Sequence, residues 1–250
     1  MQQAICFSTL LCVILPLSHE SKGVAMSNTA AEFDQLVHAR RSVRGFTSER
    51  VPDDILQSIF ETARWAPSGT NVQPWHIYVA SGEVCDRLRQ GFLERFDSGE
   101  PANTDHPNDG KIGDVWRERK RGCARVLYDS MGIEWEDREG RKMAQRRNFE
   151  FFSAPHAAFL GIHEKFGMQS AADVGMYAQT LMLAMTAHGV ASCAQGTLRN
   201  YPDFVREEFG IEPEIKILFG ISFGYEDESI PANKARTDRA PLEELVTFAE

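Results

Sequence analysis

The segment that most constrains the fold is residues 173–188, where apolar side chains cover nearly the whole circumference of a predicted helix. A helix that is apolar all round must be buried, either in a domain core or between subunits. Gly189 suits the end of this helix, because glycine readily adopts the left-handed conformation found there. We interpret Asp173 as its N-terminal cap. A chain of 250 residues is long enough to bury such a helix in one globular domain.

Helical and strand patterns alternate along the rest of the chain, which indicates a mixed, layered fold. Apolar spacing and end signals predict helices at 32–41, 52–66 and 202–209, and composition predicts helical structure over 115–150. Short apolar runs predict strands at 75–80, 156–162, 191–194 and 215–225. Residues 97–114 are rich in Gly, Pro, Asp and Asn and are expected to form a surface loop. We expect one domain over residues 26–250, with an enlarged charged helical segment at about 97–150.

Charge and cysteine content exclude several classes of site. The net charge of −9 disfavours non-specific nucleic-acid binding, and in residues 115–150 acids and bases alternate, as on a solvated surface. Five cysteines occur with no CxxC pair and no Cys/His metal spacing. This pattern predicts neither a disulfide framework nor a metal site, and it favours a reducing compartment.

The first 25 residues are treated separately from the fold. Residues 4–17 are mostly apolar, too short for a comfortable membrane span, and preceded by no Lys or Arg. Met26 then begins a stretch that is typical of a cytosolic start. We favour a start codon assigned too early and a cytoplasmic protein without stable membrane association. The alternative is an exported protein in which residues 1–25 are a real signal.

An arginine-rich segment is the first candidate for chemistry. Arg40, Arg41, Ser42 and Arg44 lie at the end of a predicted helix, and a turn there would let Arg40, Ser42 and Arg44 project to one side. Guanidinium groups bind phosphate through paired, charge-assisted hydrogen bonds. The alternative is an exposed basic run, the commoner meaning of such a cluster.

Two polar turns are further candidates. Residues 66–75 combine two prolines and Gly69 with polar side chains that suit the imide and amide edges of a heterocycle. The alternative is a loop whose side chains cap its own backbone. Residues 194–197 form a glycine-containing turn at a strand end, which can direct backbone N–H groups at a ligand or can be an ordinary turn.

Taken in order, these segments resemble the FMN-dependent nitroreductase family of NAD(P)H-dependent flavin oxidoreductases. The motifs that carry the resemblance are HARRSVR at 38–44, APSGTNVQPW at 66–75, DVG at 173–175 and RTDRAP at 236–241. The similarity extends over about residues 33–242. It implies an α+β fold, with a central, mostly antiparallel sheet flanked by helices, in an intertwined homodimer. The apolar helix at 173–188 suits the interface of that dimer.

The resemblance also implies a set of FMN-binding residues. The phosphate and part of the ring would be held by Arg40, Arg41, Ser42 and Arg44. From the other subunit, the flavin would be contacted by Pro67, Ser68, Gly69 and Asn71, with Gln73 close by. Backbone N–H groups of Gln195 and Gly196 would approach the reactive edge of the flavin. A C-terminal arginine would also reach the phosphate, and we rank Arg239 ahead of Arg236.

The implied activity is a ping-pong transfer of two electrons. NADH or NADPH would reduce the flavin, and a nitroaromatic or quinone-like acceptor would then oxidise it. No side-chain acid or base is required, so no catalytic residue is named. Residues 97–150 are longer and more charged than in a minimal member and would cover the active site, which leaves the acceptor open. The alternatives are a flavin reductase, a dehalogenase of the same fold, and a flavin-binding protein without turnover.

Overall fold

A computed structural model describes residues 26–107, 110 and 112–249 of the chain. The chain divides into two compact units, Met1–Gln35 and Leu36–Glu250. The helix α1 (Met26–Ala39) begins in the first unit and ends in the second, and all other elements belong to the second unit. The expectations for residues 1–25 lie outside the described residues. No described helix combines the length and the apolar character needed to cross a membrane.

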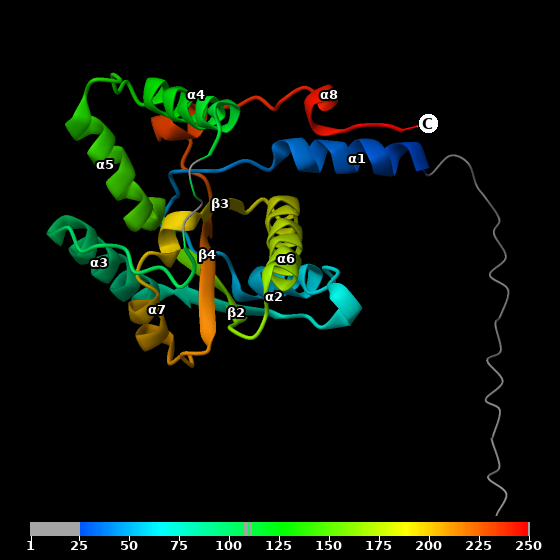
Figure 1. Ribbon diagram of the computed structural model, residues 1–250, viewed down its shortest axis with the longest axis horizontal. Coiled ribbons are helices and arrows are strands. Elements are labelled where there is room, and N and C mark those ends of the chain that lie inside the picture. Colours follow the sequence, from blue (N-terminus) through cyan, green and yellow to red (C-terminus); the bar gives the residue numbers. More distant parts are fainter. Residues whose placement is uncertain (1–25, 108–109, 111, 250) are drawn as a thin grey trace, which may run out of the picture. The chain divides into compact units, whose positions relative to one another are not determined.

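The centre of the second unit is a four-stranded antiparallel sheet. Its strands are β1 (Trp75–Ser81), β2 (His156–His163), β3 (Ala191–Gln195) and β4 (Ile215–Gly224), in the order β1-β2-β4-β3 (Figure 1). Every neighbouring pair is antiparallel. The four predicted strands and the antiparallel sheet are therefore confirmed.

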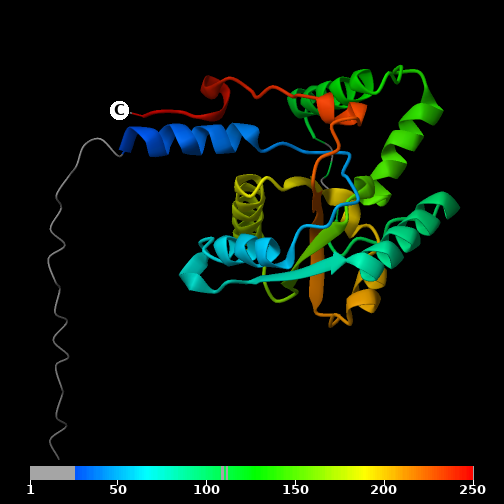
Figure 2. The ribbon, with the colours of Figure 1, turned by 180° about the vertical axis from the view of Figure 1, so that it is seen from behind.

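Helices cover both faces of this sheet, as expected (Figures 1 and 2). On one face, α2 (Asp53–Ala63) and α6 (Met168–Ala187) pack over a core cluster that includes Leu160 and Phe223. On the other face, α3 (Gly82–Ser98) and α7 (Pro202–Phe209) enclose an aromatic-rich cluster around Phe92 and Phe159. The remaining helices are α4 (Asp114–Ser130), α5 (Arg138–Phe149) and the single turn α8 (Leu242–Leu245).

The strands follow the two-residue period of a sheet buried on both faces. In β2, Ala158 and Leu160 contact the α6 side, whereas Ala157 and Phe159 contact the α3 side. The pairing of β2 with β4 shifts between Leu160 and Gly161, where one residue of β4 is skipped. Because such a bulge reverses the alternation, β4 supplies Ile215 and Ile217 to the α3 side but Ile221 and Phe223 to the α6 side.

The helix α6 differs from its prediction in two ways. It begins at Met168, so Asp173 lies inside it and the interpretation of Asp173 as the N-terminal cap is wrong. The Asp173 carboxylate instead accepts a hydrogen bond of 3.2 Å from the Gly69 N–H. One side of the helix, including Val174 and Leu181, is buried, but Met176 is 40% exposed. The exposed side of α6 therefore carries Met176, an apolar side chain that is only partly covered within a single chain.

Residues 97–114 were expected to be a surface loop, and the part that follows α3 is fixed to the domain. Asp105 accepts hydrogen bonds of 2.8 Å from the Arg206 guanidinium and from the Ile217 N–H. Its side chain is 8% exposed and that of Arg206 is 11% exposed. This buried ion pair fixes the loop against α7 and β4, an anchor that composition alone did not predict.

Candidate functional site

The arginine-rich segment after α1 is extended. Ser42 forms a parallel bridge with Ser192 of β3, and Phe46 forms an antiparallel bridge with Glu226, two residues beyond β4. The Val43 N–H donates to the Ser192 carbonyl at 3.0 Å, and the Phe46 N–H donates to the Phe152 carbonyl at 3.2 Å. Val43 and Phe46 are buried in a small apolar cluster with Cys193. Because Val43 is buried on one side of the extended chain, the side chains before and after it are directed elsewhere.

These side chains line one cavity together with residues from the other end of the chain. The cavity has a volume of about 230 Å³. From the first segment it is lined by Arg40, Arg41, Ser42 and Arg44, and from the C-terminal segment by Arg236 and Arg239. Further lining comes from Cys123 and Leu127 of α4, and from His38, Ala235 and Thr237. We call this cavity the arginine cavity. Both arginines proposed from the C-terminal segment line it, so their ranking stays a prediction.

The arginine cavity carries a concentration of unneutralised positive charge. Arg41 forms an ion pair with Glu226. The guanidinium of Arg44 donates to the Ser42 carbonyl, and those of Arg236 and Arg239 donate to nearby oxygens of their own segment. Within the described part of the chain, no carboxylate forms an ion pair with Arg40, Arg44, Arg236 or Arg239. Four guanidinium groups that share one cavity without a carboxylate partner are suited to an anion.

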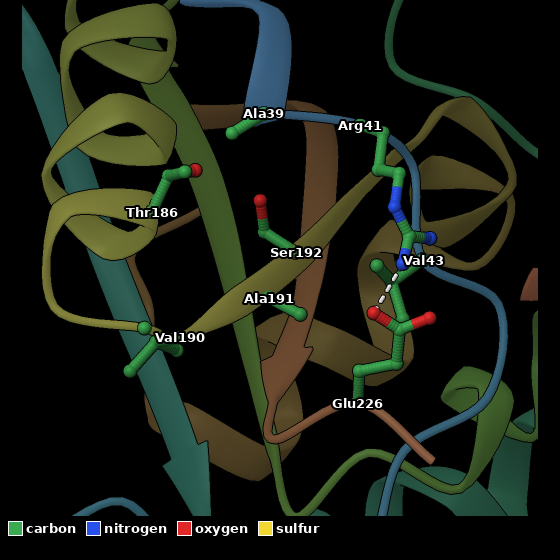
Figure 3. A pocket seen from close by; sticks show the side chains of 9 residues that line it. Ala39, Arg41, Val43, Thr186, Val190, Ala191, Ser192 and Glu226 are labelled. Carbon is green, nitrogen blue, oxygen red and sulfur yellow. Dashed lines mark hydrogen bonds and ion pairs between the residues drawn. The ribbon is translucent and has the colours of Figure 1, made fainter. Parts of the chain in front are cut away.

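Arg41 also borders a second, smaller cavity (Figure 3). This cavity of about 160 Å³ is lined by the end of α6, by Ser192 and by the Arg41–Glu226 ion pair. The Ser192 hydroxyl is buried and has no hydrogen-bond partner among the described residues. The ion pair with Glu226 distinguishes Arg41 from the other arginines that line the arginine cavity, which have no carboxylate partner among the described residues.

The turn after β3 is connected to the arginine segment through the end of α5. Gln195 is buried, and its amide accepts a hydrogen bond from the Ser222 hydroxyl and donates to the Asn148 carbonyl at 3.0 Å. The preceding residue of α5, Arg147, donates to the Arg44 carbonyl at 2.8 Å. Burial lowers the pKa of the Arg147 guanidinium. Two consecutive residues at the end of α5 therefore connect the turn to the arginine segment, and the sequence analysis did not identify either of them.

The next two residues differ in exposure. Gly196 is exposed, and a side chain at this position would meet open space. The adjacent Thr197 hydroxyl is buried and has no hydrogen-bond partner among the described residues. A planar ligand could approach the backbone of this turn closely without meeting a side chain from Gly196.

The third predicted segment, residues 66–75, lies in a different part of the fold from the arginine cavity. Gly69 contacts Asp173 near the start of α6, whereas the Arg41 segment lies beside Thr186 near its end. These two positions on α6 are roughly 20 Å apart at the rise of an α-helix. The structure therefore brings the arginine segment and the β3 turn together but leaves the loop at 66–75 remote from both.

The loop caps part of its own backbone and leaves one amide free. The Ser68 hydroxyl accepts from the Gln73 N–H at 2.9 Å, and the Gln73 side chain donates to the Asn71 carbonyl at 3.1 Å. Thr70, Asn71 and Gln73 all have positive φ, a conformation that asparagine tolerates but that is uncommon for threonine and glutamine. The Asn71 amide side chain makes no hydrogen bond within the described residues and is exposed. Self-capping explains Ser68 and Gln73, but not Asn71.

Comparison with known proteins identifies the family of this chain. The model of the nitroreductase family matches residues 37–225. The nitroreductase NfnB of Mycolicibacterium smegmatis is 40% identical over 217 residues, which cover 86% of this chain and 92% of that relative. A 4-nitrobenzoate reductase of Nocardioides sp. is 33% identical and covers 86% of this chain and 89% of its own length.

The solved structures include a similar protein with the same fold. The crystal structure of the FMN-dependent nitroreductase NfnB from Mycobacterium smegmatis in complex with NADPH superposes with a TM-score of 0.85 at 38% identity. The match covers 89% of this chain and all of that one. The chain therefore belongs to the nitroreductase family.

Proposed function

We propose that this protein is an FMN-dependent oxidoreductase that takes electrons from NADPH or NADH and reduces nitroaromatic compounds. The similar proteins described above are nitroreductases, and one was solved as an FMN-dependent enzyme with NADPH. The proposal extends these properties to this chain. Quinone-like compounds are a second class of acceptor with similar planar, electron-poor chemistry.

The observation that carries the proposal is the arginine cavity. The FMN phosphate carries about two negative charges, and guanidinium groups are its best protein partners. Arg40, Arg44, Arg236 and Arg239 supply this charge without a competing carboxylate, in a protein of net charge −9. The chemistry of these donors fits the phosphate, with the Ser42 hydroxyl as a further contact.

The turn after β3 fits the flavin ring. Gly196 leaves room for a planar group, and the unpartnered Thr197 hydroxyl is a polar group that a ligand or water can satisfy. We assign the backbone N–H groups of Gln195 and Gly196 to the polar edge of the ring. There they would stabilise the negative charge that accumulates when the flavin is reduced.

A homodimer would complete this site. The loop at 66–75 is too remote to share the arginine cavity of its own chain, but a second copy of the chain can supply the same loop. Its predicted flavin contacts are Pro67, Ser68, Gly69, Asn71 and Gln73. The partly covered side of α6, which includes Met176, provides an apolar surface for that contact. We propose that the Asn71 amide of one subunit reaches the flavin of the other.

When bound, FMN would accept a hydride from the nicotinamide and pass two electrons to the acceptor. The chain's residues bind and orient: the arginines neutralise the phosphate, and the β3 turn supplies N–H donors. Both substrates would use the same open side of the ring in turn, which predicts ping-pong kinetics. We assign no catalytic side chain.

A direct assay separates the proposed activity from its rivals. The purified protein is supplied with NADPH or NADH and 4-nitrobenzoate under anaerobic conditions, and loss of both compounds is followed. Oxidation of the nucleotide that depends on the nitro compound supports the proposal. Turnover of free FMN alone would indicate a flavin reductase, halide release from a halogenated aromatic would indicate a dehalogenase, and FMN binding without turnover would indicate a non-catalytic flavoprotein.

A further inference from the structure

Asn233 occupies an unusual position in the C-terminal segment. It lies in a single 3₁₀ turn, Pro231–Lys234, between β4 and the two cavity arginines. Its side chain belongs to a residue only 4% exposed, in a segment where Lys234, Arg236 and Arg239 are exposed. A buried amide in such a segment needs hydrogen-bond partners, because an unsatisfied amide is costly to bury.

The Asn233 amide is fully satisfied by backbone groups. Its Oδ1 accepts a hydrogen bond of 2.6 Å from the Arg44 N–H, 189 residues earlier in the chain. Its Nδ2 donates to the carbonyls of Gly45 and Asp227, each at 2.9 Å. The side chain thus uses both donors and accepts one bond, and it holds the C-terminal segment against the arginine segment.

The backbone of the same residue contacts two arginines of the cavity. The Asn233 carbonyl accepts hydrogen bonds from the guanidinium of Arg236 at 2.7 Å and from that of Arg41 at 3.2 Å. These two arginines come from opposite ends of the sequence. One buried residue therefore contacts guanidinium groups from both halves of the cavity.

The two segments approach so closely that Gly45 has no room for a side chain. A Cβ atom at Gly45 would lie 2.6 Å from the Cβ of Ile230, which is closer than atoms of this kind can approach. The Asp227 N–H also donates to the Gly45 carbonyl at 3.0 Å. The contact between the segments is thus specific, and Asn233 is its most connected polar side chain among those described above.

We propose that Asn233 is a positioning residue that holds the two halves of the arginine cavity in register for the phosphate of FMN. The inference rests on the proposed function. When the hydrogen bonds of Asn233 are formed, Arg236 is ordered before the ligand binds. Without it, the C-terminal segment has to be ordered at the moment of binding, and that cost lowers affinity. Because the ordered arginines bind the phosphate, the affinity for a flavin without a phosphate should not change.

The test compares FMN with riboflavin, which has the same ring but no phosphate. Dissociation constants are measured by flavin fluorescence for the full-length wild type and for Asn233→Ala. Asn103→Ala serves as the matched control, because within the described residues the side-chain amide of Asn103 bonds only Asp203, on the exposed surface. Asn233→Ala removes the three side-chain hydrogen bonds to Arg44, Gly45 and Asp227. We expect it to weaken FMN binding by about tenfold or more, with riboflavin binding unchanged. The control should change neither constant.

A double-mutant cycle with Arg236→Ala separates positioning from a general loss of structure. If Asn233 acts through Arg236, the loss in Asn233→Ala plus Arg236→Ala is smaller than the sum of the single losses. If Asn233→Ala does not fold, Asn233→Ser replaces it, because serine adds no charge beside the cavity and its hydroxyl can still donate or accept one hydrogen bond.

The outcomes are distinct. A selective loss of FMN affinity that is less than additive supports the inference. Equal losses for both flavins, additive losses, or no loss would overturn it and leave the proposed function intact. A wild-type protein that binds neither flavin would overturn the proposed function, and this inference with it.

Discussion

At the scale of single residues, the proposed phosphate site consists mainly of arginine side chains. The Arg44 guanidinium faces the arginine cavity and has no carboxylate partner among the described residues. We expect Arg44→Ala to raise the dissociation constant for FMN by about tenfold or more, the usual value of a hydrogen bond to a charged group. The control is Arg87→Ala, because Arg87 pairs with Glu208 on the surface of α3 and α7. Fluorescence titration that gives equal losses for both variants would contradict the assignment.

A buried histidine at the start of β2 makes stability depend on pH. The Val51 N–H donates to Nε2 of His156 at 3.0 Å, which requires this nitrogen to be unprotonated. The other ring nitrogen, Nδ1, is 2.5 Å from the Ser81 hydroxyl. Burial, followed by the charge of Arg50, lowers the pKa of His156 to about 4. The folded protein therefore excludes a proton that the unfolded chain binds below its ordinary pKa of about 6.5.

The difference between the folded and unfolded pKa of His156 sets the direction in which stability changes with pH. The free energy of unfolding should be constant with respect to His156 above about pH 6.5 and should fall as the pH drops toward 4, by about 3 kcal/mol at most. Urea unfolding at a series of pH values measures this slope. His156→Gln can still accept the Val51 N–H but does not titrate, so its slope should be shallower. Parallel curves for the two proteins would exclude His156 as the cause.

At the scale of elements, the loop after α3 is fixed by one buried ion pair. Asp105 contacts both Arg206 and the Ile217 N–H, and Asp105→Ala would leave the Arg206 guanidinium without this partner. We expect the free energy of unfolding to fall by about 2 kcal/mol, because the buried Ile217 N–H loses its acceptor and Arg206 keeps only the exposed Asp203 as a carboxylate partner among the described residues. Glu100→Ala, which removes a longer contact of 3.7 Å to Arg95, is the control and should cost far less. Equal urea midpoints for the two variants would contradict this account.

The elements show what the sequence reveals and what it does not. The strands and the helix at Pro202–Phe209 were predicted because short apolar runs and the end signals Pro202 and Gly210 are local features of the sequence. The start of α6 was missed because Gly167 has no side chain to cap a helix and the first turn holds no acidic residue. Asp173 resembled a cap, but its carboxylate binds the distant Gly69.

The residues of the candidate site also include some that the sequence predicted and some that it did not. The arginines adjacent in sequence were found, and the structure gathers them into one cavity with Arg236 and Arg239. Asn233 and Arg147 were not found, because their roles arise from contacts with Arg44 more than a hundred residues away. No local pattern distinguishes such an asparagine or arginine from others on the surface.

At the scale of the whole molecule, the proposed flavin site requires two copies of the chain. The partly covered side of α6 includes Met176, which is 40% exposed. A charge there would be costly in an apolar interface, so Met176→Glu should convert a dimer to a monomer in light-scattering measurements. FMN binding should weaken as well, because the loop at 66–75 of the partner is lost. Val115→Glu, on exposed α4, should remain dimeric. A wild-type protein that is monomeric at all concentrations would contradict the shared site.

The central claim is that the arginine cavity and its surroundings hold FMN as a working cofactor. The most direct test is the absorbance spectrum of protein purified under native conditions, followed by anaerobic titration with NADPH and NADH. We predict the bands of oxidised flavin, at about one FMN per chain, and their bleaching by at least one of the two nucleotides. A protein that stays colourless after incubation with FMN would contradict the claim, and the arginine cavity would then have to serve a different anion.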